Sequence, residues 1–146
     1  MDRRFVSPLA WIGAHPWAYP ALEVVHLFGI ALLLGSLVLL ELRVWGGAAA
    51  LPLPALARAA LPLVAAGFAL CAASGLLMFA SQPTELLGNR AFTIKMGLLM
   101  LAGTNAAAFH ARGGLQRLDH FARLQTVLSL GIWLAVIICG RSIAYL

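Results

Sequence analysis

Four apolar stretches, each long enough to cross a lipid bilayer, constrain this chain more than any other feature. A transmembrane helix needs about 20 consecutive, mostly apolar residues. The stretches cover residues 21–45, 56–80, 90–111 and 121–145, and glycine, proline or polar residues separate them. The sequence therefore predicts one all-α domain, residues 1–146, with four spanning helices.

The composition supports a membrane protein. Hydrophobic residues make up 62% of the chain and charged residues only 10%, whereas soluble domains carry about 25% charged residues. Because so few charges cannot cover a water-facing surface, we expect lipid to surround most of the chain. The ten Lys and Arg residues are scattered rather than clustered, which argues against nucleic-acid binding.

Short connections between the stretches predict antiparallel neighbours and an up-down-up-down four-helix bundle. Residues 5–19 carry Trp11, Trp17 and Tyr19 between prolines. This pattern is typical of a short interfacial segment in the headgroup zone. Both termini then share one side of the membrane, here named the terminal side. The first and third connections lie on the other, the loop side.

The basic residues predict the orientation, because loops rich in Lys and Arg stay in the cytoplasm. The loop side carries Arg43, Arg58, Arg112, Arg117 and Arg123, and the terminal side carries Arg3, Arg4, Arg90, Lys95 and Arg141. Lys95 and Arg141 lie inside helices and do not count as loop charges. Discounting them favours a cytoplasmic loop side and periplasmic termini.

Ionisable side chains inside spanning helices are costly and therefore mark candidate functional sites. His26 and Lys95 each lie about five residues into parallel helices, and Arg141 lies about four residues before the end of an antiparallel one. The helix rise places all three at one depth, roughly 6–8 Å below the terminal-side interface. Met78, near the end of the second helix, reaches the same layer.

Such a layer suits haem b. Neutral imidazole is the usual axial ligand of haem iron, so His26 is the candidate metal ligand. Gly29, one turn further along the same face, would leave room for a flat macrocycle. Arg141 and Arg90 would bind the propionates. Candidates for the opposite axial position are Lys95 with a neutral amine, His15 in the interfacial segment, and Met78.

The same residues also allow two interpretations without haem. His26 could be a core histidine hydrogen-bonded across helices, with Lys95 and Arg141 extending to the headgroups. The chain would then be a cofactor-free structural or accessory subunit. Copper handling would instead use soft ligands, and the residues available for it are Met78, Met96, His26 and Cys139.

A second polar group lies at the loop side. We interpret Glu41, Arg43 and Arg58 as an ion-pair and snorkelling set at the interface. His110 ends the third helix and is about 25–30 Å from His26 by helix rise. The two histidines therefore cannot bind one cofactor together.

Several short motifs resemble a family of small bacterial inner-membrane proteins of unassigned function, over nearly the whole chain from Tyr19 on. The motifs are residues 23–29, 40–43, 66–68, 74–79, 89–95, 105–110 and 140–145. The layout is also distantly similar to the four-helix protoporphyrinogen oxidase of bacteria and to the membrane part of copper-resistance protein D. The oxidase resemblance implies haem b, an essential histidine early in helix one and an essential lysine early in helix three. His26 and Lys95 match those positions, although the chain lacks the oxidase's characteristic C-terminal sequence.

Together these features predict a multi-pass, haem-b-binding protein of the bacterial inner membrane with a role in redox chemistry or electron transfer. A quinone, a porphyrin, a redox partner and a second copy of the chain are the candidate partners besides the bilayer. A porphyrinogen-oxidising enzyme is an alternative, and the residues leave open whether the chain is an enzyme.

Overall fold

The computed structural model describes residues 7–145, and they form seven helices. These are α1 (Ala10–Ala14), α2 (Ala18–Val44), α3 (Leu53–Ser81), α4 (Pro83–Gly88), α5 (Arg90–Ala111), α6 (Gly114–Arg117) and α7 (His120–Ser142). The helices α2, α3, α5 and α7 are long and apolar enough to cross a membrane. Arg3, Arg4 and the first two residues of the predicted interfacial segment lie outside the described residues.

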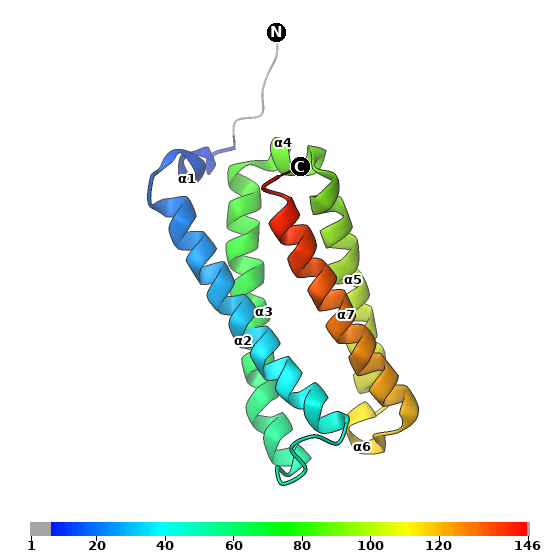
Figure 1. The fold of residues 1–146 in the computed structure, drawn as a ribbon. Helices are drawn as coiled ribbons and strands as arrows, with labels where there is room; N and C mark the ends of the chain where they lie inside the picture. Colours follow the sequence, from blue (N-terminus) through cyan, green and yellow to red (C-terminus); the bar gives the residue numbers. More distant parts are fainter. Residues whose placement is uncertain (1–6, 146) are drawn as a thin grey trace.

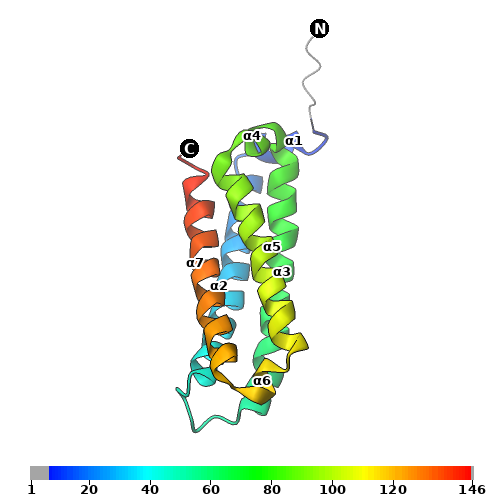
Figure 2. The same cartoon turned by 90° about the vertical axis from the view of Figure 1, so that its right-hand side faces the viewer.

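The four long helices run antiparallel to their chain neighbours, which confirms the predicted up-down-up-down bundle (Figures 1 and 2). The closest packing is within two pairs, α2 with α3 and α5 with α7, and α2 also contacts α7. The short helices α1 and α4 lie at the terminal side with the end of α7, and α6 lies at the loop side (Figure 1).

The helix starts follow from side chains that cap them. The Asn89 side chain accepts a hydrogen bond from the Phe92 N–H at 3.2 Å, and Asp119 accepts one from the Ala122 N–H at 2.8 Å. Asn and Asp are preferred N-cap residues because they satisfy an N–H group that has no partner within the helix. These caps fix the first turns of α5 and α7.

The sequence patterns do not predict the two short helices α4 and α6. Pro83 occupies the first turn of α4, where proline fits because no N–H is required there. A second short helix therefore starts where the sequence predicts only the end of a span. Gly113 precedes α6 with φ 67°, a left-handed conformation that glycine adopts readily.

Two glycines bring α2 and α3 into backbone contact. A Cβ added to Gly67 would lie 2.5 Å from the Leu33 nitrogen and 2.7 Å from the Gly29 carbonyl oxygen. A Cβ added to Gly29 would lie 2.9 Å from the Gly67 carbonyl oxygen. Small residues permit this approach in membrane bundles, where packing rather than water exclusion holds helices together. This contact, the Gly29–Gly67 crossing, fixes α2 against α3.

The outward faces of the bundle are apolar. Leu27 and Phe28 on α2, Leu76 on α3, Met100 on α5 and Ile138 on α7 are all more than 60% exposed. Exposed apolar surface on every long helix is what a lipid environment requires. The fold is therefore that of a multi-pass membrane protein.

Candidate functional site

The first component of the site is a hydrogen bond between α2 and α3. His26 lies about two turns into α2, and its Nδ1 is 2.9 Å from the Oγ of Ser74 on α3. Ser74 is only 2% exposed, and its Oγ lies 2.6 Å from the Leu70 carbonyl oxygen. A serine hydroxyl has one proton. Because the Ser74 hydroxyl donates this proton to a carbonyl of its own helix, its oxygen accepts from the His26 Nδ1–H.

This bond selects one tautomer of the neutral His26 ring. With the proton on Nδ1, Nε2 carries a free lone pair, and it makes no hydrogen bond within residues 7–145. An imidazole held in this way presents Nε2, in a fixed orientation, as a hydrogen-bond acceptor or metal ligand.

Small residues of α3 pack against His26. A Cβ added to Gly75 would lie 3.4 Å from the His26 Cε1, in ordinary contact distance. The Cys71 thiol donates to the His26 carbonyl oxygen at 3.5 Å. Because Gly75 has no side chain, the edge of the His26 ring packs against the backbone of α3. Cys71 bonds to the main chain of His26, and Ser74 bonds to its side chain.

Lys95 reaches the same region from the second helix pair. Its side chain is half-buried on α5, and its Nζ would lie 3.5 Å from a Cβ added to Gly140 on α7. Lys95 is also near enough to His26 and Cys71 for its charge to act on both side chains. The structure therefore brings His26 and Lys95, two residues singled out from the sequence, to one region between the pairs.

Arg141 and Arg90 do not join this group directly. Arg141 is exposed, and its Nη2 donates to the Tyr145 hydroxyl at 2.7 Å. Arg90 is exposed at the first residue of α5. Both guanidinium groups lie at the terminal-side ends of their helices.

His15 and Met78 occupy different surroundings. His15 is exposed after α1, and its Nδ1 accepts from the Trp17 N–H at 3.3 Å. Met78 is half-buried one turn beyond Ser74 on α3, so it shares the face of α3 that carries Ser74. Within residues 7–145, no three His, Cys, Asp or Glu side chains are placed to hold a metal ion together.

The role predicted for Gly29 is wrong. Gly29 is buried, and a Cβ there would meet the Cys71 Sγ and the Gly67 carbonyl oxygen, each at 2.9 Å. The space beside its Cα is therefore filled by α3 and cannot receive a macrocycle. Gly29 serves the helix crossing instead.

The predicted ion pair of Glu41 with the loop-side arginines is also wrong. Glu41 is 3% exposed, and its Oε2 has no hydrogen-bond partner among the described residues. The Arg43 Nε donates to the Leu51 carbonyl oxygen at 2.8 Å, and Arg58 is exposed. The Glu41 carboxyl is instead buried near Ser129 of α7.

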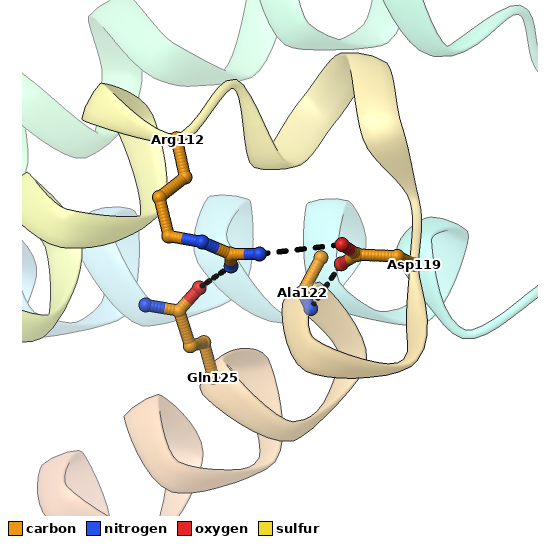
Figure 3. A network of polar contacts seen from close by, with 4 residues as sticks. All are labelled: Arg112, Asp119, Ala122 and Gln125. Atoms are coloured by element: carbon orange, nitrogen blue, oxygen red, sulfur yellow. Dashed lines mark hydrogen bonds and ion pairs between the residues drawn. The ribbon is translucent and has the colours of Figure 1, made fainter.

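The loop-side ion pair that does form involves Arg112 (Figure 3). Its Nη2 lies 3.2 Å from the Asp119 Oδ2, and its Nη1 donates to the Gln125 Oε1 at 3.0 Å. Arg112 thereby connects the end of α5 to the start of α7. Sequence reasoning missed this network, although an Asp directly before an apolar run is a recognisable N-cap signal.

Acidification is expected to loosen the first turn of α7. The hydrogen bond from the Ala122 N–H, followed by the charge of Arg112, lowers the pKa of Asp119. Because the pKa is lowered on folding, the carboxylate stabilises the fold at pH values above its unfolded-state pKa. This contribution is lost as the pH falls through the folded-state pKa. Hydrogen exchange of the α7 first turn, corrected for intrinsic rates, measures the change. The Asp119→Asn variant should lose this pH dependence, and an unaltered profile would contradict the assignment.

Comparison with known proteins identifies no family. No protein-family model matches the chain, and neither the curated proteins nor the solved structures contain a significant match. The family resemblance of the motifs therefore stays a prediction. What the fold establishes is a four-span membrane protein.

Proposed function

We propose that this chain binds haem b within the membrane and takes part in electron transfer, with His26 as the axial ligand. The observation that carries the proposal is the 2.9 Å distance between the His26 Nδ1 and the Ser74 Oγ. With Nδ1 as the donor, Nε2 is left free. Histidines that bind metals almost always donate their other N–H to an orienting group. Ser74, which is buried and fixed by its own helix, supplies that group.

Imidazole, amine and guanidinium groups, which this side of the bundle carries, are the kinds of group that would hold haem b. Nε2 of His26 would bind the iron, and Lys95 would place an amine on the other helix pair. Arg90 and Arg141, exposed at the terminal side, would pair with the two propionates at headgroup level. Haem, when bound, supplies a one-electron redox centre. The chain's own part is to orient the ligand and to exclude water with four apolar helices.

Electrons would be exchanged at the terminal side, because His26 and Lys95 lie nearer that end of the bundle. The proposed exchange partner is a membrane quinone or a redox protein. Oxidation of a porphyrinogen is the enzymatic variant of the same proposal, and it uses the same two residues, His26 and Lys95.

The optical spectrum of the full-length protein, purified after expression with ample haem, tests the proposal. We expect a Soret band that shifts on reduction and is lost in His26→Ala. The matched control is His110→Ala, because His110 is exposed at the opposite end of the bundle. A colourless wild-type protein, or a Soret band that survives His26→Ala, would contradict haem ligation by His26.

A second candidate function is a cofactor-free accessory subunit, and one observation favours it. The bond to Ser74 also suits a core histidine, since it closes the contact between α2 and α3 without a ligand. This function predicts a colourless protein that co-purifies with a stoichiometric partner. The same spectrum therefore distinguishes the two functions.

A further inference from the structure

The two helix pairs meet along a seam between α2 and α7 near the loop side. The Trp45 Nε1–H donates to the Thr126 hydroxyl oxygen at 2.7 Å across this seam. Glu41 lies about one turn before Trp45, and Ser129 about one turn after Thr126. Ser129 is close enough to the Glu41 carboxyl to interact with it. The seam therefore encloses an acidic side chain.

Glu41 is enclosed by protein rather than paired. It is 3% exposed, and its Oε2 has no partner among residues 7–145. A buried carboxylate without a partner is costly. The other titratable or charged side chains at this end of the bundle are bonded or exposed. They are Arg43 on α2, Arg58 on α3, His110 on α5, Arg112 after α5, Arg117 on α6, and Asp119, His120 and Arg123 at the start of α7.

The ligand that suits this carboxyl is a proton rather than a metal ion. Hard cations such as calcium take about six to eight oxygen ligands. The seam offers the Glu41 carboxyl and the Ser129 hydroxyl, because the Thr126 hydroxyl already accepts from Trp45 and donates to the Arg123 carbonyl oxygen at 2.8 Å. A proton needs only one carboxyl oxygen to bind and one hydrogen-bond acceptor for the resulting O–H group.

We propose that Glu41 is a proton-binding site enclosed in the α2–α7 seam. The protonated carboxyl would donate to the Ser129 oxygen. On release, the O–H bond breaks and the proton passes to water, which leaves the carboxylate. Glu41 lies three residues before Val44, the last residue of α2, so the water that exchanges this proton is on the loop side. The site is independent of haem.

Labelling of the full-length protein with the apolar reagent dicyclohexylcarbodiimide tests the site. The O–H group of a protonated carboxyl adds across one C=N bond of the reagent. The adduct then rearranges, and the whole reagent stays attached to the acid. Peptide mass spectrometry locates the adduct. We expect labelling of Glu41 that declines as the pH is raised, whereas the exposed Glu23 and Glu85 stay unlabelled.

The matched variant is Glu41→Gln, which keeps the shape of the protonated acid and should abolish the adduct without loss of folded protein. The wild-type protein alone already decides the question, so the test holds if the variant fails to fold. Labelling of Glu41 no greater than that of Glu85, or labelling independent of pH, would overturn the proposal. Protection by sodium at constant pH would overturn it in favour of a metal cation.

Discussion

Gly67→Ala is expected to destabilise the bundle, whereas Gly35→Ala should not. At Gly67 the new methyl group would lie 2.5 Å from the Leu33 nitrogen and 2.7 Å from the Gly29 carbonyl oxygen. Both neighbours are backbone atoms, so α2 and α3 must separate to admit it. Overpacking of this kind costs about 1–3 kcal/mol. The separation would also stretch the bond between His26 and Ser74.

Gly35 is the matched control because it is a helical glycine of α2 with no atom within 4 Å of an added Cβ. Replacing such a glycine with alanine stabilises a helix by up to about 1 kcal/mol. The two variants should therefore shift stability in opposite directions. Thermal unfolding in detergent, followed by tryptophan fluorescence, measures both. Equal shifts would show that the Gly29–Gly67 crossing does not hold the bundle together.

Ser74→Ala is expected to weaken haem binding by about 10–100-fold, the usual loss when an orienting partner of a metal-bound histidine is removed. Without the Ser74 oxygen, nothing described in the structure holds the His26 proton on Nδ1, and the ring can turn. This expectation depends on the proposed function. The measurement is a haem titration of the cofactor-free protein, followed at the Soret band.

Ser142→Ala provides the control for this titration. Ser142 donates to the Ile138 carbonyl oxygen at 2.8 Å, four residues earlier, as Ser74 does to Leu70. It differs from Ser74 in making no hydrogen bond to a histidine in the described part of the chain. Haem affinity should therefore be unchanged in Ser142→Ala. An equal loss in both variants would point to a general effect on helix stability.

The four spans could be predicted from the sequence because length and hydropathy are properties of single segments. A helix must present apolar side chains across the whole hydrocarbon layer, and the observed α5 has the predicted bounds. That His26 and Lys95 come near each other also follows from counting residues along α2 and α5, which run in the same direction. These predictions needed no knowledge of how one helix faces another.

The rotation of each helix about its axis could not be predicted. In a soluble protein the apolar stripe marks the buried face, but here lipid-facing and core-facing sides are both apolar. The sequence therefore predicts a cofactor beside Gly29, whereas Gly29 faces Gly67 in the structure. It likewise predicts an arginine partner for Glu41, whereas Glu41 faces α7.

The structure of the segments that connect the long helices could not be predicted for a different reason. Short helices such as α4 and α6 depend on a few turn residues and on their neighbours, so apolar periodicity does not reveal them. The bonds of Arg112 to Asp119 and Gln125 link residues on both sides of the third connection. Sequence counting treats Arg112 only as a loop charge, because the fold of that connection decides its partners.

The division of the bundle into two closely packed pairs has a consequence for its biogenesis. Each pair consists of helices joined by one short connection, so each is an αα-hairpin that can close before the rest of the chain is present. Chains are made from the N-terminus, and membrane helices form before they associate. The α2–α3 hairpin can therefore close while α5 and α7 are still being synthesised. The α2–α7 contact, with Trp45 and Glu41, can form only after α7 has been made.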